Sequence, residues 1–180
     1  MPNAQGDQQR LQGIVHDHHA FTWRLLRRLG VRPDRLQDAV QQVFLVTVKR
    51  IADIEPGLER SWIIGASMRV AAEARRETGR FLLEEDCAVQ PRVDPSPGPE
   101  ELADRKQARA LLDRVLDAMP ADLRVVFVLF ELEELTSLEI ASLLELAPGT
   151  VASRLRRARE SFHNGVKRLG LRPPNAGGIP

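Results

Sequence analysis

Apolar residues recur at helical spacing along most of this 180-residue chain. In residues 9–29, 34–51 and 58–76 they return every three or four positions, so that each segment has one apolar side. Glycine and proline signals separate these segments, at Gly30–Pro33 and at Glu55–Gly57. The pattern therefore predicts three amphipathic helices in the first half of the chain.

The helical periodicity fails beyond Gly79, and the run Val93–Pro99 alternates proline with polar residues and glycine. Proline removes an amide donor and restricts the residue before it, so this run cannot sustain a helix. We interpret residues 81–99 as a flexible linker between a domain at 9–80 and a second domain at 100–172. A loop within one domain is the alternative interpretation.

Beyond the linker the pattern predicts four helices, over residues 100–119, 122–133, 137–144 and 148–169. Thr136 followed by Glu139 fits the capping box, in which a hydroxyl and a carboxylate satisfy the first amides of a helix. Pro148 suits the first turn of the last helix. A short capped helix, a brief turn and a basic helix form a helix-turn-helix. The sequence thus predicts an all-α protein with two small helical domains, the second of which contains this motif.

Charge is distributed unevenly along the chain. The whole molecule carries a formal charge of +1, but the stretch 148–172 has seven Lys and Arg residues against Glu160 alone. A local excess of this size indicates a polyanionic partner for the C-terminal domain.

The last helix has a polar face suited to a DNA major groove. We expect one apolar side on the two helices of the motif, formed by Leu138, Ile140, Ala141, Leu144, Val151 and Leu155. On the opposite side, spacings of three, four and seven bring together Thr150, Ser153, Arg154 and Arg157. Arginine bridges the two acceptors of a guanine, and hydroxyls bond phosphates or base edges. Arg156 and Arg159 flank this face and suit phosphates. The alternative is a basic helix that is merely solvated.

The C-terminal half also resembles a known family. The resemblance rests on Met119–Leu129, Glu131–Thr136, Glu139–Ala141 and Gly149–Arg159, which are similar to the C-terminal domain of extracytoplasmic-function (ECF) sigma factors. In that family this domain reads the minus-thirty-five promoter element. Ala152 departs from the pattern, because the family usually has lysine there.

The second predicted helix has a polar stripe opposite its apolar one, and such a stripe can dock on another protein's basic helix. Ordinary solvation is the alternative explanation of spacing alone. The string Asp38–Leu45 resembles the segment with which ECF sigma factors bind the β′ clamp helices of RNA polymerase. The resemblance implies contacts from Asp38, Gln41, Gln42 and Leu45, with Gln42 in place of the usual glutamate.

Ser61–Ile64 and the basic helix that follows resemble the region that melts and captures the minus-ten element. The resemblance implies DNA contacts from Trp62, Arg69, Arg75 and Arg76, since melted bases need stacking surfaces and cationic grooves. A tryptophan near a helix start is also commonly a core residue. The loop 53–60 matches in position the loop that in relatives helps hold a flipped base.

Other chemistry finds little support in the sequence. His16, His18 and His19 lack the spacing of a helical metal site, and Cys87 has no recognisable nucleophile motif around it. We expect no metal, no cofactor and no enzymatic activity. No apolar run of transmembrane length and no signal-peptide pattern is present, so we expect a cytoplasmic protein with no direct membrane insertion.

The resemblance implies three partners: core RNA polymerase, through its β′ clamp helices and β flap, promoter DNA, and an anti-sigma factor. The sequence predicts an alternative sigma factor that directs promoter-specific transcription initiation. Two other functions remain open. One is a helix-turn-helix regulator that binds DNA without replacing a sigma subunit, and the other is a sigma-like decoy that sequesters an anti-sigma protein.

Overall fold

The structure is a computed structural model that describes residues 4–81 and 99–170, with side chains described for 8–76 and 106–170. The chain divides into two compact units, residues 1–94 and 95–180. The predicted linker, residues 81–99, lies outside the described residues except for its two ends, Phe81 and Pro99.

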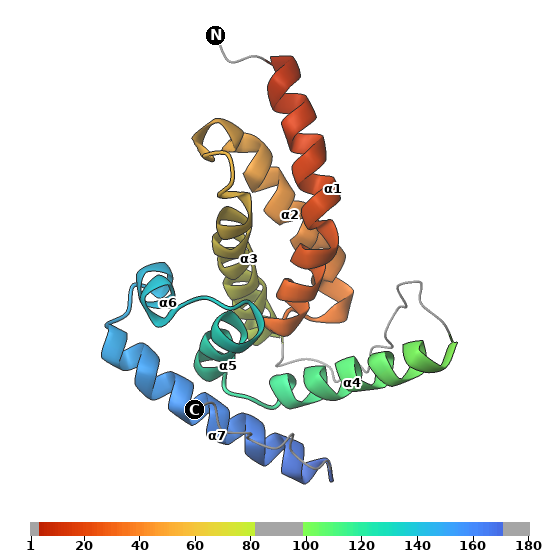
Figure 1. Ribbon diagram of the computed structural model, residues 1–180, viewed down its shortest axis with the longest axis vertical. Coiled ribbons are helices and arrows are strands. Elements are labelled where there is room, and N and C mark those ends of the chain that lie inside the picture. Colours follow the sequence, from red (N-terminus) through yellow and green to blue (C-terminus); the bar gives the residue numbers. More distant parts are fainter. Residues whose placement is uncertain (1–3, 82–98, 171–180) are drawn as a thin grey trace. The chain divides into compact units, whose positions relative to one another are not determined.

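The N-terminal unit is built from three long helices, which Figure 1 shows packed lengthwise. In chain order its elements are α1 (Ala4–Arg28), the 3₁₀ turn η1 (Pro33–Arg35), α2 (Leu36–Lys49), the 3₁₀ turn η2 (Ile51–Asp53) and α3 (Glu59–Phe81). Each of the three helices contacts both of the others.

The expected apolar stripe of α2 is confirmed, because its buried residues are Leu36, Ala39, Val40, Val43, Phe44 and Thr47. The helix therefore presents a separate exposed side. The expected end of the third helix is wrong: α3 continues past Arg76 and Gly79 to Phe81. One internal glycine costs a helix about 1 kcal/mol, which a helix of 23 residues can offset.

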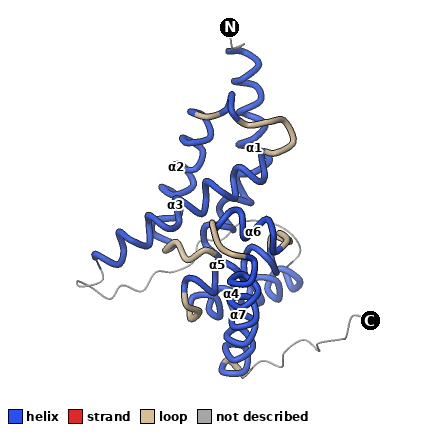
Figure 2. Tube along the Cα trace, turned by 90° about the vertical axis from the view of Figure 1, so that its left-hand side faces the viewer, coloured by secondary structure: helices blue, strands red, loops and turns tan. Residues whose placement is uncertain are grey.

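The C-terminal unit contains α4 (Pro99–Asp117), α5 (Ala121–Phe127), the π-helical turn η3 (Val128–Leu132), α6 (Ser137–Leu144) and α7 (Pro148–Arg168). Across the described parts of both units, only helices, turns and loops occur, as the colouring of Figure 2 shows. The predicted all-α class is therefore confirmed.

Helix α7 is fixed by close packing against its neighbours. The rings of Phe127 and Phe162 stack with centroids 4.6 Å apart, which joins α5 to α7. At Gly165 the Val115 side chain of α4 packs so closely on the α7 backbone that an added Cβ would lie 2.8 Å from Cγ1 of Val115. Val151 and Leu155 of α7 are buried on the side where α7 packs against α6. These contacts determine which side of α7 faces solvent.

The predicted cap of α6 is confirmed. The Glu139 amide donates to the Thr136 hydroxyl, and the Thr136 amide donates to the Glu139 carboxylate at 2.7 Å. The Thr136 hydroxyl also donates to the Glu139 carboxylate, at 2.7 Å, and these two donors of Thr136, the amide first, lower the pKa of Glu139. At its other end α6 closes on Glu145, whose φ of 52° is left-handed, and the Leu146 amide returns to the Ala141 carbonyl at 2.9 Å. Both ends of this short helix are therefore fixed by local hydrogen bonds.

One residue of the expected apolar side of the motif is misplaced. Leu138 is 71% exposed, whereas Ile140 and Ala141 are buried. Leu138 is the second residue of α6, and Ile140 follows two positions later, about 200° around the helix. The two side chains therefore cannot share one face, and the interior of the motif starts at Ile140.

Candidate nucleic-acid interface and docking face

The outer face of α7 begins with two hydroxyl residues and a guanidinium. Ser153 and Arg157 are exposed, and Thr150 is half-buried. The Ser153 hydroxyl donates to the Thr150 carbonyl at 2.9 Å. This backbone bond fixes the Ser153 rotamer while leaving its oxygen lone pairs available to a donor outside the helix.

Three of the predicted DNA-binding arginines of α7 are paired with acids inside the unit. The Arg154–Asp122 pair is loose, with a closest N–O distance of 3.8 Å. Arg156 bonds Glu160 one turn along the helix at 2.9 Å. An anion that binds these guanidinium groups would therefore have to compete with the carboxylates.

Arg159 is held more firmly than the others. Its Nε donates to Glu131 at 2.7 Å, and its guanidinium lies 5.3 Å from the Phe130 ring centroid. Sequence reasoning missed Asp122 and Glu131, because each lies about 30 residues from its arginine in the chain and no local pattern connects them.

Beyond Arg157 the polar side of α7 continues along a shallow groove of about 610 Å³. Its lining residues are Leu123, Arg157, Glu160, Ser161, Asn164, Lys167 and Arg168. Three cations against one acid give this groove a positive potential.

The exposed side of α2 carries the residues expected at the polymerase. Asp38, Gln41 and Leu45 are all exposed, and their spacings of three and four place them in one line along the helix. Val48, which sequence reasoning missed, extends the line and is 42% exposed, beside Leu45 at 52%. Gln42 lies to one side, where its amide donates to Glu73 of α3 at 3.4 Å.

Helix α3 places its four predicted DNA-binding residues in different surroundings. Arg69 and Arg76 are exposed, and the Arg69 guanidinium lies 5.9 Å from the half-buried Trp62 ring. Arg75 instead donates to the Leu29 carbonyl at the end of α1 at 2.8 Å, and burial lowers its pKa. Arg75 therefore fastens α3 to α1, which the local sequence did not predict.

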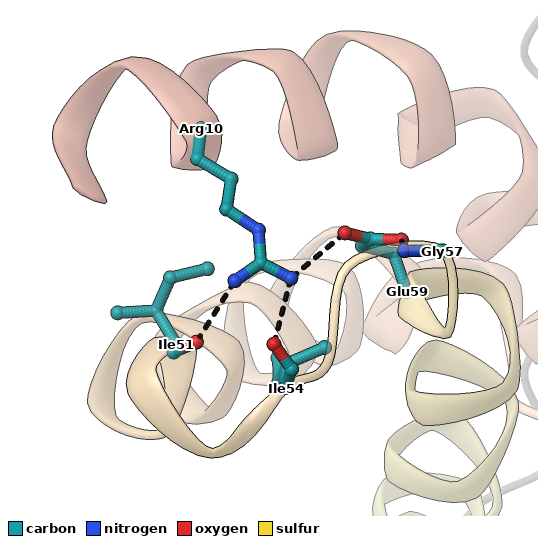
Figure 3. A network of polar contacts seen from close by, with 5 residues as sticks. All are labelled: Arg10, Ile51, Ile54, Gly57 and Glu59. Carbon is teal, nitrogen blue, oxygen red and sulfur yellow. Dashed lines mark hydrogen bonds and ion pairs between the residues drawn. The ribbon is translucent and has the colours of Figure 1, made fainter. Parts of the chain in front are cut away.

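The loop before α3 is held from α1 by a single side chain (Figure 3). Arg10 donates to the carbonyls of Ile51 and Ile54, at 3.4 and 2.7 Å, and to the Glu59 carboxylate at 2.8 Å. The Glu59 carboxylate also accepts the Gly57 amide at 2.7 Å. The hydrogen bond from Arg10 is the largest cause of a lowered pKa at Glu59. Sequence reasoning did not single out Arg10, since its partners lie 41 to 49 residues away.

The histidines of α1 lie apart from any cluster of metal-binding side chains within the described residues. No three His, Cys, Asp or Glu residues there are grouped to hold a metal ion. His19 instead stacks on Phe44, with ring centroids 6.2 Å apart. Within residues 4–81 and 99–170, no helix has both the length and the apolar character needed to cross a membrane.

Comparisons with known proteins find similarity to sigma factors. A family model described as sigma-70, region 4 matches residues 109–162. The chain is 28% identical over 168 residues to the ECF RNA polymerase sigma factor SigE of Mycolicibacterium smegmatis, covering 90% of this chain and 65% of SigE. It is 39% identical over 71 residues to the ECF RNA polymerase sigma-E factor of Escherichia coli, covering 39% of this chain and 37% of that protein. The chain thus spans less than two thirds of the length of these curated relatives.

Two solved structures share the fold. CnrH, in complex with the cytosolic domain of CnrY, gives a TM-score of 0.64 at 18% identity and covers 92% of each chain. The sigma factor RpoE of Bartonella quintana, in complex with the anti-sigma factor NepR, gives 0.64 at 19% identity, covering 89% of this chain and 96% of RpoE. These two structures show the fold, whereas the region 4 match and the curated relatives show that the chain is similar in sequence to extracytoplasmic-function sigma factors.

Proposed function

We propose that this protein is an alternative sigma factor: it binds core RNA polymerase, directs it to particular promoters and is controlled by an anti-sigma factor. The observation that carries the proposal is the combination, in one chain, of a capped helix-turn-helix with a basic outer face and a separate helix with an exposed polar and apolar line. A DNA-binding repressor needs the first surface but not the second.

The N-terminal domain, residues 9–80, docks on polymerase through α2. Asp38 and Gln41 supply hydrogen bonds and charge, and exposed Leu45 and Val48 supply apolar area on the same line. Interface centres combine apolar contact with a polar rim, and this line has both. The β′ clamp helices of polymerase are its target. Gln42 contributes less, because its amide is already engaged by Glu73.

The C-terminal domain, residues 100–172, reads the minus-thirty-five element through α7. Thr150, Ser153, Arg154 and Arg157 face the groove, and Arg156 and Arg159 contact phosphates. Among these arginines only Arg157 has no acidic partner within the described side chains, so it is the one that binds DNA without first breaking a bond. The same domain meets the β flap of polymerase.

The minus-ten element is taken by α3 and the loop before it. Exposed Arg69 and Arg76 attract the backbone of a melted strand, and the Trp62–Arg69 pair offers it a stacking surface. Arg75 is left out of this surface, because its guanidinium is bound to the Leu29 carbonyl. The protein itself performs no catalysis in this scheme, since polymerisation belongs to its partner.

Control by an anti-sigma factor is supported by the two similar solved structures, one of which contains an anti-sigma factor and the other the cytosolic domain of CnrY. An inhibitor of this kind keeps the sigma factor from polymerase by covering the surfaces that polymerase binds. The protein acts on DNA together with polymerase, and we place it in the cytoplasm.

In vitro transcription with purified core RNA polymerase and a promoter library tests the proposal. A sigma factor yields transcripts from a subset of promoters that share upstream and minus-ten elements. If the chain binds such DNA but supports no initiation, the protein is a helix-turn-helix regulator. If it neither binds DNA nor supports initiation but captures an anti-sigma protein, it is a decoy.

The docking face is tested by changing Asp38→Ala together with Gln41→Ala. We expect core polymerase affinity to fall about tenfold, since two interface hydrogen bonds are worth on the order of 1–3 kcal/mol together. The matched control changes Gln9→Ala with Gln12→Ala, two exposed amides with the same spacing on α1. Equal affinities of the two double variants in a titration with fluorescent core enzyme would remove α2 from the interface.

A further inference from the structure

The 51–58 loop, which comprises η2 and the residues between η2 and α3, is short, exposed and bonded by a side chain of α1. Its exposed residues include Asp53, Glu55 and Leu58, the last of which is 51% exposed. Ile54, by contrast, is 3% exposed and anchors the loop in the core. The loop therefore has a buried anchor and an exposed edge.

Besides its own backbone bonds, from Ile54 to Ile51 and from Leu58 to Glu55, this segment is bonded by Arg10 of α1. Its guanidinium reaches the Ile51 and Ile54 carbonyls and, through Glu59, the Gly57 amide at the tip of the loop (Figure 3). Gly57 has a φ of 90°, a conformation that side-chain-bearing residues rarely adopt. One side chain of α1 thus ties down both ends and the tip of the loop.

The loop leads directly into the surface that carries Trp62. The Trp62 amide donates to the Leu58 carbonyl at 3.0 Å, so Leu58 is fixed one helical turn before Trp62. The indole Nε1 of Trp62 is buried and has no hydrogen-bond partner within the described residues, which leaves the ring held by packing and by Arg69. Fixing Leu58 therefore fixes the apolar edge beside the Trp62–Arg69 pair.

We propose that Arg10 is a positioning residue for base recognition: it holds the 51–58 loop in one conformation, so that Leu58 and the Trp62–Arg69 pair present a fixed surface to an unstacked base. The inference rests on the proposed function, in which this part of the protein binds the melted minus-ten strand. A surface ordered before its ligand arrives loses less entropy on binding and discriminates more sharply between similar ligands.

An arginine is needed for this task because three acceptors in different directions must be bound at once. The planar guanidinium offers five donors in a fixed fork, whereas a lysine ammonium is a single point of charge. Arg10→Lys therefore retains the ion pair with Glu59 but loses the simultaneous hold on the Ile51 and Ile54 carbonyls.

The test uses holoenzyme reconstituted from the full chain and core polymerase. The probes are fluorescent single-stranded oligonucleotides that carry the minus-ten element selected by the wild type, and copies with one base replaced at each position in turn. We expect Arg10→Ala to reduce the preference for the selected base at one or two positions by fivefold or more. Arg10→Lys and Glu59→Gln should give intermediate losses. Affinity for core enzyme and for an upstream-element duplex should stay within twofold.

Arg32→Ala is the matched control, because it removes an arginine–carboxylate pair of similar length, 3.0 Å to Asp34, at another surface of the same unit. Unchanged base preference in Arg10→Ala overturns the inference, and so does an equal loss of affinity for every oligonucleotide. A parallel loss of core affinity, or a base preference lowered equally by Arg32→Ala, also overturns it, because the role of Arg10 would then be general stability. If wild-type holoenzyme shows no base preference at all, the proposed function itself fails.

Discussion

The loose pair between Arg154 and Asp122 offers a measurable control on DNA recognition. Their side chains are 31% and 48% exposed, and the closest N–O distance is 3.8 Å. Exposed pairs of this kind are worth about 0.2–1 kcal/mol, whereas a good base contact from arginine is worth about 1–3 kcal/mol. In the proposed complex a cognate base would take Arg154 away from Asp122, and the lost pair would subtract up to about 1 kcal/mol from the binding free energy.

Two substitutions separate these contributions. Asp122→Asn keeps the shape of the side chain but removes the competing charge, so cognate affinity should rise about two- to fivefold. Arg154→Ala should lower cognate affinity by roughly 1–2 kcal/mol, or about 5- to 30-fold, and leave a scrambled duplex within twofold. In the Arg154→Ala background, Asp122→Asn should have almost no effect, because the group it released is gone.

The assay is fluorescence anisotropy of the full chain on a cognate upstream-element duplex and on a scrambled one, at several salt concentrations. Glu160→Gln is the control, since it frees Arg156, a predicted phosphate contact, and should change both duplexes equally and by less than twofold. An Asp122→Asn gain of the same size with and without Arg154 would refute the reasoning. The carboxylate would then act on DNA directly and not through the arginine.

Three further changes test the structure. Thr136→Ala should lower the unfolding free energy of the C-terminal unit by about 1 kcal/mol, because the α6 cap is lost, and an unchanged urea midpoint would contradict the cap. Gly165→Ala should destabilise the C-terminal unit by about 1–3 kcal/mol, because the added Cβ would collide with Val115. Gly149→Ala is the control and should be neutral or slightly stabilising, since no atom lies within 4 Å of its added Cβ. Equal melting temperatures of the two variants would disprove close packing at Gly165. The pKa of Glu59 is lower in the folded state than its ordinary value of 4.5. The ionised carboxylate therefore stabilises the fold above pH 4.5, and this stabilisation is lost as the pH falls through the folded pKa. Glu59→Gln should weaken the dependence of the unfolding free energy on pH in urea titrations, and an unchanged dependence would count against the bond from Arg10.

Local patterns in the sequence were sufficient for most of the fold. The capping box at Thr136 predicted where α6 begins, and Pro148 predicted where α7 begins, because both signals depend on residues within one turn. The exposure of Asp38 and Gln41 followed from the three-and-four spacing of α2 alone. Family resemblance then gave these exposed positions a function, which the spacing could not.

Long-range pairs were beyond sequence reasoning. Nothing near Arg10 indicates that it bonds a loop more than 40 residues away, and nothing near Arg75 indicates the Leu29 carbonyl. The same limitation applied to Asp122, whose charge matters only because α5 lies against α7. Leu138 was misplaced for a local reason, since an apolar residue in the first turn of a short helix was assigned to the wrong side.

The π-helical turn η3 has a consequence for how the length of this chain can vary. Its Glu133 amide bonds the Val128 carbonyl five residues back, so the turn holds one residue more than an α-helical turn would. Losing one residue from 128–132 converts the turn to α-helix and leaves the flanking segments in register. The same loss inside α7 would rotate everything after it by about 100° and divide its basic face between two sides of the helix. A one-residue deletion at 128–132 should therefore be tolerated by the C-terminal unit far better than one inside α7.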